Sequence, residues 1–156
     1  MSEPIELRFS TELAAPPDVV WERAGSVSGA NDELWPLAKM TFPFPVDRHT
    51  PPEQVLGREF RSWMIALGFL PVDRRTLRIE VFEEGRFRES SVSWMQGRWT
   101  HERSAVAGDG GSTVLTDTLV IEPRGPLMRA FLSPAITATF RRRHRRLRRH
   151  FEKRGA

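Results

Sequence analysis

Residues 140–154 read FRRRHRRLRRHFEKR, and this basic stretch decides how the rest of the chain is understood. Along it and just before it, apolar or aromatic side chains recur at spacings of four, four, three and four, at Ile136, Phe140, His144, Leu147 and Phe151. This is the spacing of one helix face that packs against a body, with the arginines on the other faces. The stretch is therefore predicted to be a docked helix and not a free nucleic-acid-binding tail.

The composition indicates a single domain with a mildly acidic body and one basic helix. The 156 residues are 39% hydrophobic and 28% charged, which is typical of a globular protein. The net charge is +4, but residues 140–154 carry eight Arg and one Lys against one Glu, so the other residues sum to −4. The chain has no cysteine, no apolar stretch of about 20 residues and no secretion signal. We therefore expect a cytoplasmic protein without disulfides or a transmembrane segment.

The arginines of the basic helix leave two interpretations open. They form a solvated face that is partly paired with acidic neighbours, or the segment Arg141–Arg149 makes a weak contact with an anionic surface. Nucleic acid is disfavoured as a partner because no aromatic side chains alternate with the arginines to stack on bases. A protein that is acidic outside one helix also differs from nucleic-acid-binding domains that are basic throughout.

Upstream of this helix, the sequence alternates in the manner of antiparallel strands. Ile5–Leu13 places apolar side chains at every second position, and two short helices are predicted after it, near residues 19–24 and 30–35. Further strands are predicted at 38–44, 59–67, 76–83, 86–95, 98–107 and 112–122, separated by a Pro-rich loop and Gly-containing turns. The long helix is predicted from Pro134 to Lys153 with Ser133 as its N-cap, and Leu127–Leu132 as a separate helical turn.

This order of elements predicts an α+β fold with a cavity. A strongly twisted antiparallel sheet has a concave face that must be covered, and the only long amphipathic element is the last helix. Where the curvature of the sheet exceeds what side chains fill, a gap remains between sheet and helix. Gaps of this kind bind apolar ligands.

Four segments resemble the START-like or SRPBCC superfamily, which has the helix-grip fold. They are ELAAPPDVVWERA at 12–24, RWTHER at 98–103, GGSTVLTDTLVIEPRGP at 110–126 and FRRRHRRLRRHF at 140–151, and the last three resemble a bacterial branch labelled polyketide cyclase. The resemblance covers the whole chain as one domain, 1–156. It implies a curved sheet of six to seven strands around a long C-terminal helix, with a hydrophobic cavity between them. Members of the superfamily bind lipids, hormones or polyketides, and some catalyse cyclisation or hydrolysis, so no single activity is implied.

The turn at Gln96-Gly97 predicts which aromatic side chains share a face of the sheet. If these two residues are the centre of the turn, Trp94 lies opposite Trp99, and His101 falls on the same face. The two tryptophans either pack against each other across the strands or line the cavity. His101 is a structural histidine, a ligand contact or an acid–base catalyst.

A second predicted register brings a charged pair together. A loop around Gly110 places Arg103 opposite Asp117, although a slip of one residue would send Asp117 to the other face. The pair is either a structural ion pair or a group that orients a ligand. His144, on the apolar helix face, either makes a core contact or points into the cavity. The carboxylates Glu80, Glu83, Glu84 and Glu89 are expected to be exposed charges of the sheet.

The mouth of the cavity is predicted between the second short helix, the strand after it and the start of the last helix. The candidate ligand-binding residues are Trp35, Met40, Phe42, Trp63, Trp94, Trp99, His101, Arg103, Asp117, Met128, Phe131, Ile136 and Phe140. No metal-binding, dinucleotide-binding or nucleophile-elbow motif is present, and no metal or cofactor is expected.

The first functional hypothesis is therefore a module that binds a small hydrophobic or amphipathic molecule, lipid-like or polyketide-like, as a monomer or homodimer. The alternative is an enzyme of the cyclase or dehydratase type, in which His101 acts as acid–base and Arg103 or Asp117 orients it. The third is an adaptor that binds anions through the basic helix.

Overall fold

The computed structural model describes residues 3–154 as one curved sheet covered by helices. In chain order the elements are β1 (Ile5–Leu13), α1 (Pro17–Ala24), α2 (Val27–Leu34), β2 (Ala38–Met40), α3 (Pro52–Val55), β3 (Glu59–Ala66), β4 (Leu70–Glu83), β5 (Arg86–Ser93), β6 (Gln96–Ala107), a 3-10 turn (Asp109–Gly111), β7 (Thr113–Pro123) and α4 (Pro126–Arg154). The α+β helix-grip fold with two short helices after the first strand is confirmed.

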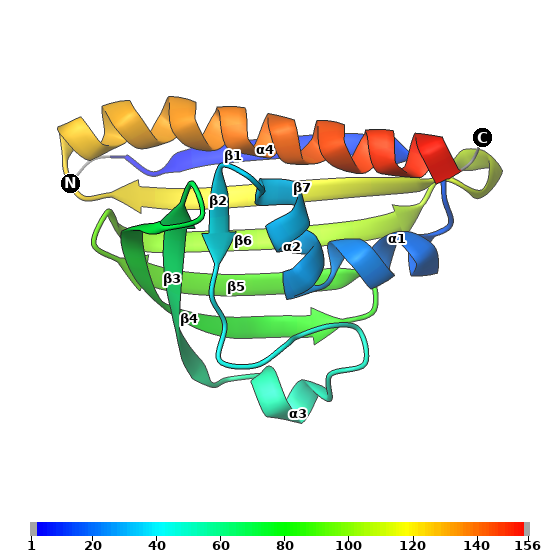
Figure 1. Ribbon diagram of the computed structural model, residues 1–156, viewed down its shortest axis with the longest axis horizontal. Coiled ribbons are helices and arrows are strands. Elements are labelled where there is room, and N and C mark those ends of the chain that lie inside the picture. Colours follow the sequence, from blue (N-terminus) through cyan, green and yellow to red (C-terminus); the bar gives the residue numbers. More distant parts are fainter. Residues whose placement is uncertain (1–2, 155–156) are drawn as a thin grey trace.

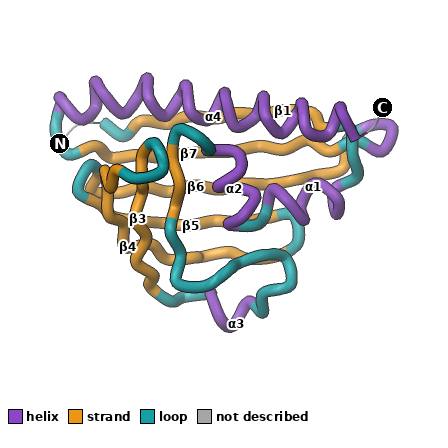
Figure 2. The backbone as a smooth tube through the Cα atoms, in the orientation of Figure 1, coloured by secondary structure: helices purple, strands orange, loops and turns teal. Residues whose placement is uncertain are grey.

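The sheet has seven antiparallel strands in the order β1-β7-β6-β5-β4-β3-β2. Because β1 pairs with β7, the first strand closes one edge of the meander formed by β3 to β7. Figure 1 shows α4 running the length of the sheet beside β1 and β7, with α1 and α2 in front of the middle strands. Figure 2 shows that the long loop after β2 leads to α3, which lies below β4.

α4 is held on the sheet by its apolar face, as the periodicity predicts. Phe140, Leu147 and Phe151 are at most 3% exposed. The ring of Phe140 stacks on Phe9 of β1 with 5.5 Å between ring centroids. Phe151 and Leu147 belong to a core cluster with Trp21 of α1. The basic helix is therefore docked on the body of the protein.

α4 begins eight residues earlier than the sequence predicts. Pro134 lies inside the helix, and Leu127–Leu132 belongs to the same helix instead of forming a separate turn. Proline removes one N–H donor from the helix ladder, here the donor for the carbonyl of residue 130. Ala130 is exposed, so water can satisfy that carbonyl and the helix continues.

The two short helices are joined tightly, and this places α2 over the sheet. Ser26 caps α2 by accepting a hydrogen bond from the backbone N–H of Gly29 at 2.9 Å. A Cβ atom at Gly29 would lie 1.8 Å from the backbone oxygen of Arg23, so only glycine allows this approach of α2 to α1. The close turn directs Glu33 of α2 toward the interior, where it is 1% exposed.

Three other expectations were wrong. β4 begins at Leu70, six residues before the strand predicted at 76–83, and the Pro-rich loop contains the short helix α3. The β5–β6 register is also shifted, because Ser91 pairs with Trp99 and Glu89 pairs with His101. Gly97 lies at an irregularity of β6 and not at the centre of the turn. The β6–β7 register, with Arg103 opposite Asp117, is as predicted.

Candidate functional site

A cavity of about 410 Å³ lies between the sheet, α2 and α4. Its volume is within the range of small-molecule sites, roughly 300–1,000 Å³. Most of its wall is apolar, formed by residues such as Leu34, Val72, Ile79 and Phe87. The polar side chains on the wall are few, and they gather in one region, where β4, β5 and β6 face α4.

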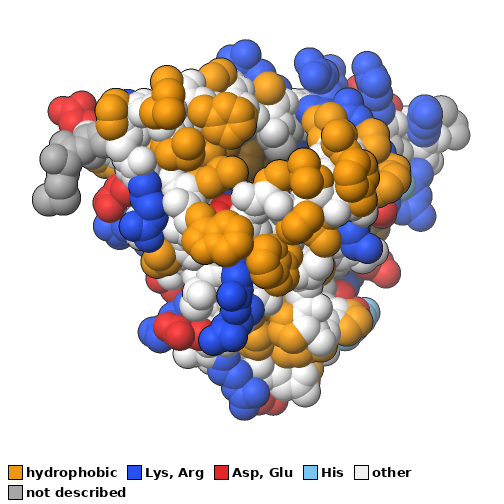
Figure 3. All heavy atoms as spheres, turned by 60° about the vertical axis from the view of Figure 1, so that its left-hand side comes forward, with side chains coloured by type: hydrophobic (Ala, Val, Ile, Leu, Met, Phe, Trp, Pro, Cys, Tyr) orange, Lys and Arg blue, Asp and Glu red, His pale blue; other side chains and the backbone are white. Residues whose placement is uncertain are grey.

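Exposed apolar side chains lie beside several of the residues that line the cavity. These come from three elements: the segment between α2 and β2, the β3–β4 turn and the first turns of α4. They are Trp35, Leu37, Leu67, Phe69, Leu70, Leu127 and Phe131, which are 45–78% exposed. Figure 3 shows hydrophobic side chains gathered around a hollow on this side of the molecule.

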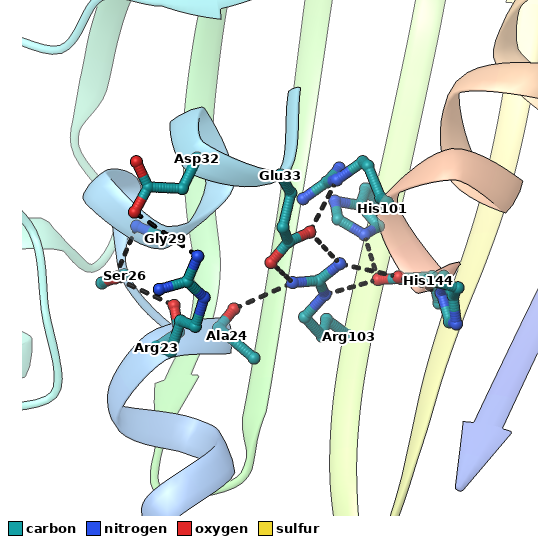
Figure 4. A network of polar contacts seen from close by, with 11 residues as sticks. Arg23, Ala24, Ser26, Gly29, Asp32, Glu33, His101, Arg103 and His144 are labelled. Carbon is teal, nitrogen blue, oxygen red and sulfur yellow. Dashed lines mark hydrogen bonds and ion pairs between the residues drawn. The ribbon is translucent and has the colours of Figure 1, made fainter. Parts of the chain in front are cut away.

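Arg103 of β6, which lines the cavity, is the centre of a buried ionic network. Its guanidinium donates to both oxygens of Glu33 at 2.8 and 3.0 Å, and to both oxygens of Asp117 at 2.8 and 2.9 Å. It also donates to the backbone oxygen of Ala24 at 3.1 Å. Figure 4 shows Arg103 between α1, α2 and the sheet. A guanidinium that uses all its donors within the protein has a structural role. Burial alone would lower the pKa of Arg103, but the two carboxylates more than offset this effect, so the pKa is raised.

Two histidines share the other side of Asp117. His101 Nε2 lies 2.7 Å from Asp117 Oδ1, and His144 Nε2 lies 2.7 Å from Asp117 Oδ2. Burial alone would raise the pKa of Asp117, but the charge of Arg103 and these hydrogen bonds hold it well below its usual range. Asp117 is therefore an ionised acceptor, and both histidines present an Nε2 hydrogen to it.

His101 lies on the cavity wall between two carboxylates. Besides Asp117, it has Glu89 Oε1 at 3.7 Å from its Nδ1. Burial alone would lower the pKa of His101, but Asp117 and Glu89 more than offset this, so the pKa is raised. The pKa of Glu89 is lowered despite its burial, because His101 and Arg75 stabilise its charge. The structure therefore places an imidazole that favours its protonated form beside a carboxylate, at the edge of an apolar cavity.

Arg75 of β4 is a charged group on the cavity wall without a complete set of partners. Within residues 3–154, its Nε has no hydrogen-bond partner, and its nearest carboxylate, Asp73, is 3.7 Å away. Its guanidinium lies over the ring of Trp99, 4.6 Å from the ring centroid. Burial lowers the pKa of Arg75, a cost that nearby Glu89 and Asp73 only partly offset. A buried guanidinium with unused donors is a group that a ligand anion would satisfy.

A family model described as a domain of unknown function (DUF8410) matches residues 11–151. The chain belongs to this family. Among curated proteins, none matches the sequence.

Solved structures similar to this DUF8410 chain include aromatase/cyclases. The Zhui aromatase/cyclase from a Streptomyces species aligns with a TM-score of 0.74 at 15% identity, over 99% of this chain and 97% of that one. The di-domain aromatase/cyclase StfQ of the steffimycin pathway aligns at 0.67 and 10% identity, over 98% of this chain and 52% of that one. A Thermus thermophilus protein aligns at 0.63 and 19% identity, over 96% of each chain. At these identities the likeness establishes the helix-grip, polyketide cyclase-like fold and nothing finer.

Of the side chains expected at the site of this DUF8410 domain, eight line the cavity: Met40, Phe42, Trp99, His101, Arg103, Phe131, Ile136 and Phe140. Five do not: Trp35, Trp63, Trp94, Asp117 and Met128. Asp117 is 0% exposed and lies behind the wall, whereas Trp94 is 61% exposed and packs edge-on against Trp63 on the other face of the sheet. The shifted β5–β6 register is the reason for the error at Trp94, because an odd shift reverses which face a side chain takes.

Four charged residues of the site were not expected from the sequence. Glu33 and Glu89 are 1% and 7% exposed, so Glu89 is not the surface charge that was expected, although Glu80, Glu83 and Glu84 are exposed. Arg75 and Arg143 line the cavity. A signal existed for Arg143, because it lies three residues after Phe140 and four before Leu147, on the apolar helix face.

The described residues, 3–154, contain no group of three His, Asp or Glu side chains placed to hold a metal ion. Over the same range, no helix is both long and apolar enough to cross a membrane.

Proposed function

We propose that the protein binds a small amphipathic molecule in the cavity, with an apolar body and one anionic or strongly polar group. The observation that carries this proposal is Arg75, whose Nε lacks a hydrogen-bond partner on the wall of an otherwise apolar cavity of about 410 Å³. The apolar wall would bind the body of the ligand, at about 25 cal/mol per Å² of surface removed from water. Arg75 and the neighbouring polar wall would orient the polar group.

A second guanidinium supports an acidic end on the ligand. Arg143 of α4 also lines the cavity, and its Nε donates to Glu33 Oε2 at 2.8 Å. Its guanidinium carbon lies 4.7 Å from the ring centroid of Phe140. Two arginines that are each stacked on an aromatic ring form a rigid site for a carboxylate, a phenolate or an enolate.

The test compares two probes that differ only in their polar end, dodecanoate and 1-dodecanol. Binding is followed by the fluorescence of Trp99, which lines the cavity. Dodecanoate is expected to bind about 10- to 100-fold more tightly, since a hydrogen bond to a charged group is worth about 1.5–3 kcal/mol. Arg75→Met should reduce this preference sharply, with Arg143 left as the only guanidinium of the proposed site. The matched control is Arg74→Met, because Arg74 lies on the opposite face over Trp63 and does not line the cavity. Equal affinities for both probes, or equal effects of the two substitutions, would contradict the proposal.

One observation favours a catalytic alternative of the dehydratase type. His101, held between Asp117 and Glu89 at the cavity wall, can donate a proton, and the Glu89 carboxylate can accept one. In the dehydration of a β-hydroxy ketone, Glu89 would take the proton from the carbon beside the carbonyl. The C–O bond would then break as His101 protonates the hydroxyl, which leaves as water.

The catalytic alternative is tested with 4-hydroxy-4-phenylbutan-2-one, whose dehydration product is conjugated and absorbs in the near ultraviolet. His101→Gln should abolish turnover, and it should lower the melting temperature no more than the control does, since each substitution removes one bond to Asp117. His144→Gln is the control, because His144 binds the same carboxylate but does not line the cavity. Absence of turnover by the unmodified protein would contradict the catalytic alternative, and only the binding function would then be supported.

A further inference from the structure

Outside the cavity, α4 and the edge strand β1 enclose a second hollow, open to solvent and about 450 Å³ in volume. We call it the β1–α4 groove. It is lined by four arginines, Arg8, Arg141, Arg145 and Arg148, together with Phe9, Ser10, Thr11 and His144. Among residues 3–154 no carboxylate lines it, so this wall has a formal charge of +4 before His144 is considered.

The arginines of this groove are mostly unpaired, unlike several on the outer strands of the sheet. On the sheet, Arg78, Arg86, Arg88 and Arg98 each have a glutamate oxygen 3.1–3.5 Å away. In the groove only Arg148 has an acidic partner among residues 3–154, with Glu152 Oε1 3.1 Å from its Nε. Three like charges without counter-charges repel one another, and an anion bound between them would relieve that repulsion.

A buried imidazole below the groove is also unsatisfied. His144 is 7% exposed, and its Nε2 is committed to Asp117. Its Nδ1 is buried and has no hydrogen-bond partner within residues 3–154. An unpaired buried nitrogen requires an explanation, and a ligand that covers the imidazole from the groove supplies one.

We propose that the β1–α4 groove binds the phosphate group of a small phosphorylated molecule, over His144 and between Arg8, Arg141, Arg145 and Arg148. A guanidinium presents two parallel donors that match two phosphate oxygens, and several such groups suit a polyanion better than a single carboxylate. The volume of the groove is that of a small-molecule site.

The groove is unsuited to nucleic acid, because its aromatic residue, Phe9, is stacked on Phe140 and is not free to stack on a base. This site does not depend on what the cavity binds. Asp117 lines neither site but connects them, since it binds His144 at the groove and His101 at the cavity wall.

The test uses pyrophosphate as the probe, titrated by calorimetry into the full chain at low ionic strength, about 20 mM, where charge screening is weak. Arg145→Gln is expected to weaken binding about tenfold or more, the effect of losing one charged donor pair. The matched control is Arg149→Gln on the same helix, which removes the same charge from an exposed position outside the groove. Its affinity should stay within about twofold of that of the unmodified chain, because only long-range attraction is lost.

A second measurement locates the bound probe. In an NMR titration, the ring signals of His144 should shift with pyrophosphate, whereas those of His49 and His150, which do not line the groove, should not. The proposal is overturned if pyrophosphate does not bind, or if Arg149→Gln weakens binding as much as Arg145→Gln. Binding that leaves the His144 signals unmoved would also overturn it.

Discussion

Replacing Asp117 with Asn tests whether the buried network holds the site together. Asp117 is 0% exposed, and its two oxygens accept four hydrogen bonds at 2.7–2.9 Å. Asparagine keeps the shape but has one acceptor oxygen, and its NH₂ group would face N–H donors. It also leaves the charge of Arg103 balanced by Glu33 alone, a carboxylate that already has a second cation in Arg143.

The expected loss follows from the burial of this pair. Removing one partner of a buried ion pair costs about 3–5 kcal/mol. This is a large part of the roughly 5–15 kcal/mol that stabilises a domain. At about 1–3 kcal/mol per molar of urea, the unfolding midpoint should fall by more than about 1 M.

The control is an exposed pair of similar geometry. Glu59 Oε1 lies 3.2 Å from Arg78 Nη2, and both side chains are more than half exposed. Glu59→Gln should cost about 0–1 kcal/mol, because water screens such pairs. If Asp117→Asn lost no more stability than Glu59→Gln in the same urea titration, the network would not act as a buried structural unit.

Three further predictions concern stability. The pKa of His101 is raised in the folded protein, so protonated His101 stabilises the fold. This contribution is full below about pH 6.5, the pKa of the unfolded chain, and it is lost as the pH rises through the folded pKa. In urea titrations at stepped pH, the stability of the unmodified chain should therefore fall above pH 6.5 relative to that of His101→Gln. If the free energies of unfolding of the two proteins followed parallel curves against pH, this prediction would be refuted. Leu115→Ala, at a 0% exposed core position, should cost about 2–5 kcal/mol, and Val106→Ala, at a 57% exposed one, about 0.5 kcal/mol or less; comparable losses would contradict the assigned core. Pro134→Ala should raise the melting temperature, because alanine restores a helix donor; a lower value would show that proline suits this position.

Periodicity and turn chemistry predicted most of the fold. The spacing of Phe140, Leu147 and Phe151 identified the docked face of α4, and this needs only local sequence. The pairing of Arg103 with Asp117 was also predicted correctly. The β5–β6 register failed because Gln96-Gly97 looks like a two-residue turn, while in the structure Gly97 lies within β6.

The charged residues of the site were much harder to predict. Glu33 reaches Arg103 across 70 positions of sequence and Arg143 across 110, and no local pattern links them. A glutamate on a short helix is predicted to be a surface charge unless the packing of that helix is known. Arg75 and Glu89 lie between neighbours that point to the opposite face of the sheet, so the face that each one takes depends on register.

The most direct test of the ligand-binding account uses the five isoleucines of the chain as reporters. Ile79 and Ile136 line the cavity, whereas Ile5, Ile65 and Ile121 do not. In a perdeuterated protein with protonated isoleucine δ1 methyl groups, NOEs from bound dodecanoate should reach Ile79 and Ile136 and none of the other three. NOEs to Ile5, Ile65 or Ile121 alone, or no NOE from a probe that demonstrably binds, would contradict the account.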